Sequence, residues 1–165
     1  MQKPLIIVSS RTGNTRILAH AAADALRAPL VSADALPDDL TPFNPVILAF
    51  WCDKGRAPDD MIEAARRLEG KDVGCLVTMG ADPASDFGRD FLEQAPRLLC
   101  GSSNTLRMTF GCRGRISQAV FDRLTAMLGG VVTPERQANK LASDSHPDRQ
   151  DVEDAVGAVL EAFAR

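Results

Sequence analysis

Residues 5–15 read LIIVSSRTGNT, and this stretch decides the fold. Residues 5–8 form an uninterrupted apolar run bounded by polar residues, which is typical of a β-strand buried on both faces. The stretch leads directly into residues 14–26, where apolar side chains recur on one helical stripe. A buried strand followed at once by an amphipathic helix indicates a β–α unit of a parallel sheet.

The alternation of strand and helix continues along the chain. We expect further strands at residues 30–31, 46–51, 73–79 and 105–110, and helices at residues 59–68, 86–99, 117–128 and 148–164. Residues 133–147 are expected to form a short helix and a polar loop. Right-handed crossovers place helices on both faces of such a sheet. The sequence therefore predicts an α/β fold, a doubly wound five-stranded parallel sheet of order 2-1-3-4-5.

Composition and length set the broad class of the protein. The chain has 165 residues with a net charge of −3, which allows one domain, so residues 1–165 are expected to form it alone. The small net charge argues against a nucleic-acid-binding protein, which would be clearly basic. No apolar run reaches the roughly 20 residues of a membrane span, and the first residues lack the pattern of a secretory signal. Four cysteines without a CxxC pair favour reduced thiols, and we expect a cytoplasmic protein.

The loop at residues 9–15 has the composition of an anion-binding site. Ligands of open α/β sheets bind at the carboxyl ends of the strands, where this loop lies. The hydroxyls of Ser10, Thr12 and Thr15, together with N–H groups at a helix N-terminus, are suited to hold a phosphate. Gly13 allows the chain to turn tightly there. An ordinary helix cap needs one Ser, Thr or Asn, whereas this loop has five in seven positions.

Several other kinds of phosphate-binding protein are excluded by particular residues. The GxxxxGK[ST] spacing of a nucleotide P-loop and the GxGxxG of a dinucleotide site are both absent. A phosphatase of similar topology needs a cysteine nucleophile in this loop, and none is present. A receiver domain needs carboxylates at the end of the first strand, where Ser9 and Ser10 stand.

Residues 10–15, SRTGNT, resemble the [ST]-x-T-G-x-T phosphate loop of the flavodoxin family. The resemblance continues through FWCDKGRAP at 50–58, TMGADP at 78–83 and FGCRGRIS at 110–117, and so spans most of the chain. These segments are similar to a bacterial flavodoxin-like subgroup with a Trp-x-x-x-Gly loop and a late Cys-x-Gly-[KR] turn. The resemblance implies the flavodoxin-like version of the doubly wound fold and FMN as the cofactor.

The resemblance also implies a role for each of three loops. The first loop would hold the FMN 5′-phosphate, and Trp51 would lie against or beside the isoalloxazine ring. Gly55 would let the second loop adopt positive φ, while Gly80 and Ala81 would present N–H groups to the pyrimidine edge of the flavin. No catalytic residue or metal ligand is expected. The residues expected to bind the cofactor are Ser9, Ser10, Arg11, Thr12, Gly13, Asn14, Thr15, Trp51, Cys52, Asp53, Lys54, Gly55, Thr78, Met79, Gly80, Ala81 and Asp82.

The sequence differs from that of typical flavodoxins in two features. Those proteins usually stack a tyrosine from the third loop on the outer flavin face, and this chain has no tyrosine. The outer face is therefore expected to be open, with Phe87 as a substitute unless it packs in the core. Arg11, Lys54 and Arg56 lie on the expected flavin rim, where cations favour the reduced anionic flavin. We expect a less negative reduction potential than in acidic flavodoxins.

The resemblance implies an electron-transfer protein that delivers electrons to a partner oxidoreductase, as a monomer or weak dimer. One alternative is an FMN-dependent reductase or oxidase that acts on a small organic or tetrapyrrole substrate at an open flavin face. Another is a non-redox binding module that has lost the cofactor. Cys112, expected after the last strand, is either a redox thiol beside Arg113 or a small packed residue in a glycine turn. His20 and His146 have no neighbours that indicate a metal site.

Overall fold

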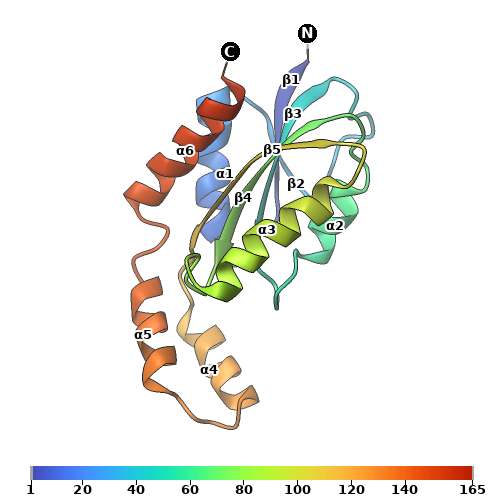
Figure 1. Ribbon diagram of the computed structural model, residues 1–165. Coiled ribbons are helices and arrows are strands. Elements are labelled where there is room, and N and C mark those ends of the chain that lie inside the picture. Colours follow the sequence, from blue (N-terminus) through green and yellow to red (C-terminus); the bar gives the residue numbers. More distant parts are fainter. Residues whose placement is uncertain (1, 165) are drawn as a thin grey trace.

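A five-stranded parallel sheet forms the centre of the computed structural model, which describes residues 2–164 (Figure 1). Its strand order is β2-β1-β3-β4-β5, which confirms the predicted fold class and topology. The weak apolar pair at residues 30–31 does form an edge strand, paired with β1. The strands are β1 (Lys3–Val8), β2 (Leu30–Ser32), β3 (Phe43–Trp51), β4 (Asp72–Met79) and β5 (Thr105–Arg113).

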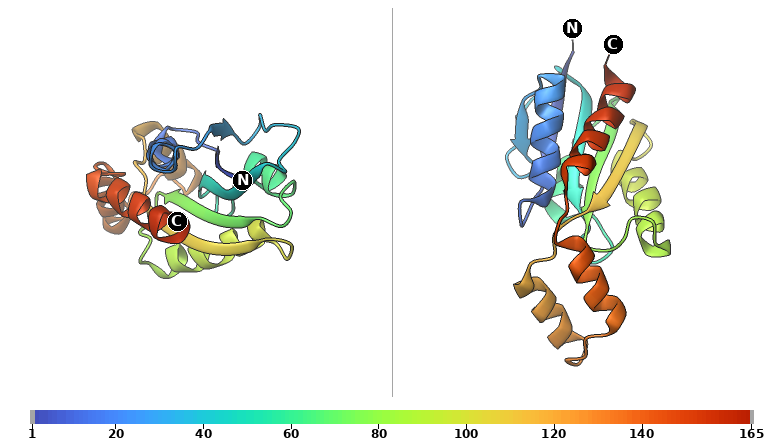
Figure 2. Two further views of the ribbon diagram at one scale, coloured as in Figure 1. Left: turned by 90° about the horizontal axis from the view of Figure 1, so that it is seen from above. Right: turned by 90° about the vertical axis from the view of Figure 1, so that its left-hand side faces the viewer.

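Helices cover both faces of the sheet (Figure 2). On one side lie α1 (Asn14–Leu26) and α6 (Arg149–Phe163), and on the other lie α2 (Asp59–Ala65) and α3 (Asp86–Cys100). Side chains of β1 alternate between two cores: Ile6 and Val8 pack under α1 and α6, whereas Leu5 and Ile7 pack under α2 and α3. This alternation explains why residues 5–8 are apolar without interruption. No helix among residues 2–164 is long and apolar enough to cross a membrane.

Three expected boundaries differ by three residues in the structure. Strand β3 begins at Phe43, earlier than the expected start at residue 46. Helix α2 ends at Ala65, three residues earlier than expected, although Leu68 beyond it is still buried in the core. Strand β5 runs on to Arg113, because β4 continues beside it and pairs Thr78 with Cys112 and Met79 with Arg113. Cys112 therefore lies within the last strand and not after it.

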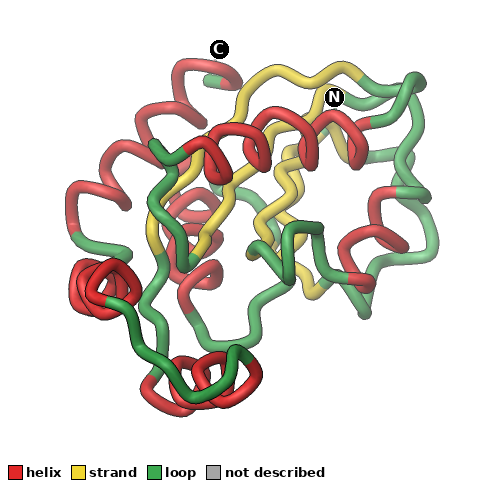
Figure 3. The backbone as a smooth tube through the Cα atoms, turned by 60° about the horizontal axis from the view of Figure 1, so that its bottom comes forward, coloured by secondary structure: helices red, strands yellow, loops and turns green. Residues whose placement is uncertain are grey.

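The remaining two helices, α4 (Gln118–Met127) and α5 (Pro134–Ser143), form a hairpin that projects beyond the carboxyl ends of the strands (Figures 1 and 2). Both helices were expected from the sequence. Neither covers a face of the sheet, because the helix pairs described above already occupy both faces. The hairpin instead lies next to the loops that follow the strands (Figure 3).

Candidate cofactor-binding site

The three loops singled out by the sequence follow β1, β3 and β4, which are adjacent strands in the sheet. Since these strands are parallel, all three loops lie at the carboxyl edge of the sheet, near its centre. The edge strands β2 and β5 flank them on either side. This is where ligands bind in doubly wound folds.

The first loop ends in a helix N-terminus that no side chain caps. Gly13 is the N-cap of α1, has φ 97°, and leaves the first turn without a side-chain hydrogen bond. The N-caps of α3 to α6 do accept such bonds, through Ser85, Ser117, Thr133 and Asp148, whereas Pro58, the N-cap of α2, does not. The first N–H groups of a helix have no partner within it. The hydroxyl-rich loop therefore does not act as an ordinary cap, and the N–H groups of the first turn of α1 remain available to an anion.

Two hydroxyls of the first loop bind other elements of the protein, and Ser10 Oγ accepts the N–H of Gly13 within the loop at 3.2 Å. Ser9 Oγ donates to the carboxylate of Asp60 in α2, at 2.8 and 3.0 Å from its two oxygens. Thr15 Oγ1 lies 2.7 Å from Thr78 Oγ1, and both threonines are buried. These contacts fasten the loop to α2 and to the end of β4. Arg11 and Thr12 at the tip of the loop are exposed.

Asp60 lies in the first turn of α2, and no motif in the sequence singled it out. Its carboxylate also accepts the backbone N–H of Met61 at 2.8 Å, which is consistent with a position in the first turn of α2. The contact with Ser9 joins residues 51 positions apart. No local pattern indicates such a pair.

The loop after β5 packs directly on the first loop. The side-chain amide of Asn14 donates to the Arg115 carbonyl at 3.0 Å and to Thr12 Oγ1 at 3.3 Å. A Cβ at Gly114 would lie 2.8 Å from the Asn14 side-chain nitrogen, so glycine permits this close approach. Asn14 thus orients the first loop instead of pointing into an open site.

The second loop contains a tight turn next to Trp51, the half-buried last residue of β3. Asp53 and Arg56 exchange backbone hydrogen bonds of 2.8 and 3.1 Å. Between them Lys54 has φ 52° and Gly55 has φ 81°, the positive pair of a type I′ turn. This confirms the positive φ predicted at Gly55, and it presents the Lys54 side chain to solvent.

The third loop is anchored by a hydrogen bond from α5, a helix that is distant from it in the sequence. Thr78 and Met79 are buried at the end of β4, whereas residues 80–82 are partly exposed. The carbonyl of Gly80 accepts a hydrogen bond from the side-chain amide of Asn139 at 2.8 Å, and Asn139 also accepts one from Arg113. Arg113 in turn pairs with Asp82 at 3.1 Å. Asn139 lies 59 positions from Gly80, and the sequence analysis missed it.

Phe87 is not a core residue of α3, because 51% of its surface is exposed. Its ring stacks on Phe91 with the centroids 6.5 Å apart. A Cβ at Gly55 would lie 3.8 Å from the ring, so Phe87 borders the turn of the second loop. An exposed aromatic ring thus lies beside one of the three loops in a chain without tyrosine.

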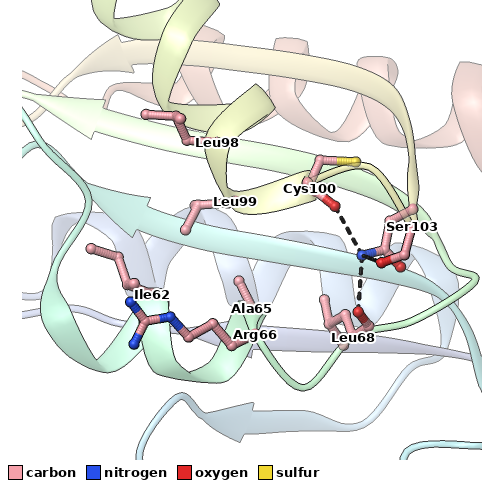
Figure 4. A pocket seen from close by; sticks show the side chains of 10 residues that line it. Ile62, Ala65, Arg66, Leu68, Leu98, Leu99, Cys100 and Ser103 are labelled. Carbon is pink, nitrogen blue, oxygen red and sulfur yellow. Dashed lines mark hydrogen bonds between the residues drawn. The ribbon is translucent and has the colours of Figure 1, made fainter.

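Two cavities lie between α2 and α3 on one side of the three loops. The first, of about 290 Å³, is at the end remote from the loops, where the Asn104 side chain bridges the carbonyls of Leu68 and Cys100 (Figure 4). The second, of about 350 Å³, begins at Gly55 and is lined by Phe87 and Phe91. Neither includes the first loop, whose helix N-terminus lies on the open surface.

The Cys112 thiol does not readily ionise to the thiolate that redox chemistry requires. It is buried, and burial, followed by the negative charges of Asp151 and Asp148, raises its pKa to about 12. The structure thus favours packing over a reactive thiol.

We expected His146 to have no neighbours that indicate a metal site, and this prediction was wrong. His146 Nδ1 lies 2.5 Å from Asp151 Oδ2, and the Asp148 carboxylate is close to both. Asp148 and Asp151 already form the capping box of α6, which accounts for this cluster structurally. His20 is exposed on α1.

Comparisons with known proteins agree with this architecture. The chain is 26% identical to the flavodoxin-like domain-containing protein BilS of Clostridioides difficile (strain CD3) over 164 residues, covering 93% of this chain and 92% of that protein. It superimposes on oxidised flavodoxin 2 of Bacillus cereus with a TM-score of 0.60, 17% identity and coverage of 98% and 99%. General stress protein 14 of Treponema denticola, solved in complex with FMN, gives 0.54, 13% and coverage of 98% and 99%. The flavodoxin domain model matches residues 5–160, and the chain therefore belongs to the flavodoxin domain family.

Proposed function

We propose that the protein binds FMN at the three loops and carries electrons to a partner oxidoreductase. The observation that carries this proposal is the uncapped N-terminus of α1, which directly follows the loop that resembles the phosphate loop of flavodoxins. FMN has a phosphate, and a helix N-terminus with free N–H groups favours that charge. When bound, FMN supplies the electron-accepting and electron-donating chemistry, and the protein supplies binding, orientation and electrostatics.

Each loop has its own task in this proposal. The first loop, residues 9–15, holds the phosphate through the N–H groups of the α1 N-terminus and the exposed Thr12. The second loop, residues 51–55, lies beside the flavin ring, with Trp51 and Lys54 next to it. The third loop, residues 78–82, presents N–H groups to the polar edge of the ring and is kept in place by Asn139. No acid, base or nucleophile of the protein is needed.

Comparing FMN with riboflavin tests the phosphate role, because riboflavin lacks the phosphate. We expect the purified protein to be yellow and to bind FMN at least about tenfold more tightly than riboflavin, as measured by quenching of flavin fluorescence. Thr12→Glu places a carboxylate in the anion site and should abolish that preference while leaving riboflavin binding unchanged. Ser102→Glu, at an exposed position before β5, is the matched control and should behave as the wild type. A colourless protein that ignores added FMN contradicts the proposal.

A second candidate function is supported by the cavity between Gly55 and Leu99. It lies beside the second loop and is lined by Phe87 and Phe91, so a small apolar substrate of an FMN-dependent reductase would fit there. The test is the rate at which the reduced protein is oxidised by menadione. Gln94→Trp, which narrows the cavity, should slow this reaction if the cavity binds the acceptor and should leave it unchanged if the protein is only a carrier.

A further inference from the structure

The α4–α5 hairpin, residues 118–143, leaves an apolar face uncovered. Val120, Leu124 and Met127 of α4, with Leu128 at its C-cap, recur at the spacing of one helical face. Such a stripe normally packs on a core, but the last three of these side chains are 41% to 67% exposed. Of the ten large hydrophobic side chains that are exposed among residues 2–164, six belong to the hairpin: Leu124, Met127, Leu128, Val131, Val132 and Leu141.

The contacts that hold the hairpin together are mainly polar and do not use this face. Phe121 is its only buried large apolar side chain, with the Arg136 guanidinium 5.5 Å from the ring centroid. Lys140 pairs with Asp144, and Ser143 Oγ accepts the N–H of Ile116 at 3.1 Å. The core of the domain is already covered by other helices. An exposed apolar surface that does not contribute to the protein's own core indicates an interaction site.

The charged residues around the apolar face of the hairpin indicate which kind of partner would bind there. Residues 113–143 carry five basic and two acidic side chains, and two of the basic ones, Arg113 and Lys140, pair with Asp82 and Asp144 outside this range. Arg115 and Arg123 are exposed and form no ion pair with any residue of the described range 2–164, and the same is true of Arg11 and Lys54 on the neighbouring loops. Two copies meeting through this face would bring like charges together. A surface with carboxylates is complementary to it.

The position of the hairpin links it to the proposed flavin site. Asn139 binds the Gly80 carbonyl in the third loop, and Arg113 joins Asn139 to Asp82 in the same loop. A protein seated on the hairpin therefore lies next to the loops that would hold the flavin, at the carboxyl edge of the sheet (Figure 1). Electron transfer needs such an approach.

We propose that the apolar face of the α4–α5 hairpin docks a protein redox partner whose contact surface is apolar at its centre and acidic at its rim. This inference rests on the proposed function, and it adds the identity of the docking surface and the sign of the partner's charge. In the reaction, one electron leaves the reduced FMN and enters the partner's oxidised redox centre.

The test uses the FMN-loaded protein, reduced with dithionite and mixed with ferric cytochrome c in a stopped-flow instrument. Native cytochrome c is basic, and the succinylated form carries carboxylates in place of its lysine charges around the exposed haem edge. We expect faster reduction of the succinylated form, and the advantage should shrink as salt is added. Leu124→Gln with Met127→Gln, which changes no charge, should slow this reaction at least about tenfold. Leu160→Gln, at an exposed position on α6, should stay within about twofold of the wild type.

Several outcomes would contradict the docking proposal while leaving the proposal of FMN binding intact. One is a double variant as fast as the wild type, and another is faster reduction of native cytochrome c. A third is a wild-type dimer in sedimentation that the double variant dissociates, since a second copy then covers the face. Oxidation by p-benzoquinone should be equal in all variants, which separates lost docking from a damaged flavin site. Failure to bind FMN at all contradicts the proposed function instead.

Discussion

The side-chain amide of Asn139 donates a 2.8 Å hydrogen bond to the backbone carbonyl of Gly80. This bond joins the α4–α5 hairpin to the third loop, which the family resemblance assigns to the polar edge of the flavin. Asn139 also accepts a hydrogen bond from Arg113 of β5. One side chain of the α4–α5 hairpin therefore contacts both the last strand and the proposed cofactor site.

Replacing Asn139 with alanine leaves the Gly80 carbonyl and the Arg113 guanidinium without this partner. We expect Asn139→Ala to lower the free energy of unfolding by about 1–3 kcal/mol and to weaken FMN binding, because the third loop loses its support. Urea denaturation and flavin fluorescence measure the two effects. Gln137→Ala, at an exposed position on the same helix, is the control. Equal unfolding midpoints for the two variants would contradict this role of Asn139.

Gly13 has a backbone conformation that a residue with a Cβ adopts at a cost, since its φ is 97°. Gly13→Ala should therefore lower the free energy of unfolding by about 1–2 kcal/mol and weaken FMN binding more than riboflavin binding. Gly157 is the matched control, because it lies inside α6 with open space around it. Gly157→Ala should raise stability by about 0.5–1 kcal/mol. Equal FMN affinity in both variants would show that the turn at Gly13 does not shape the anion site.

Gly88 lets α3 pack closely on the third loop. A Cβ there would lie 2.3 Å from the Asp82 carbonyl oxygen and 2.8 Å from the backbone of Pro83, so the loop itself must move. We expect Gly88→Ala to cost about 1–3 kcal/mol of stability and to reduce the affinity for FMN and riboflavin alike, since both contain the ring. A loss confined to FMN would argue against contact between this loop and the ring.

Cys112 should be unreactive in the folded protein. Its pKa is raised to about 12, so the thiolate fraction at pH 8 is smaller than for a free cysteine. Alkylation by iodoacetamide, followed by intact mass, should be slow at pH 8, faster as the pH rises toward 11, and complete in urea at either pH. Rapid modification of Cys112 at pH 8 in the native protein would restore the reactive-thiol interpretation.

Removing the exposed cation at Lys54 should make the reduction potential of bound FMN more negative. For a charge about 10 Å from the flavin in a water-like dielectric, the change is on the order of 10 mV for a two-electron couple. Lys54→Gln and the control Lys3→Gln, at the opposite end of the sheet, can be compared by redox titration at low salt. A shift of equal size in both variants would mean that Lys54 acts only through the net charge.

The sequence predicted the sheet because its signals are local. The apolar run at residues 5–8 and the helical stripe after it each lie within a few residues, and β1 and α1 formed as expected. The positive φ at Gly55 was implied by the family resemblance, and the turn that contains it closes locally between Asp53 and Arg56.

Periodicity reports an apolar face and not what covers that face, and for this reason it misjudged Phe87. Phe87 fits the apolar stripe of α3 and stacks on the core residue Phe91, but it lies half exposed at the edge of the core, next to the turn at Gly55. The stripe of α4 likewise resembles that of a core helix, yet both faces of the sheet are already covered.

What the amino-acid sequence determined by itself is the order of strands and helices, the family and the phosphate-loop pattern at residues 10–15. Only the tertiary structure decided that Ser9 binds Asp60, that Thr15 meets Thr78, and that the hairpin holds Gly80 through Asn139. These pairs are 51 to 63 residues apart in the chain. Hydrogen bonds over such separations depend on how the sheet brings its carboxyl ends together, and no local pattern of residue types records that geometry.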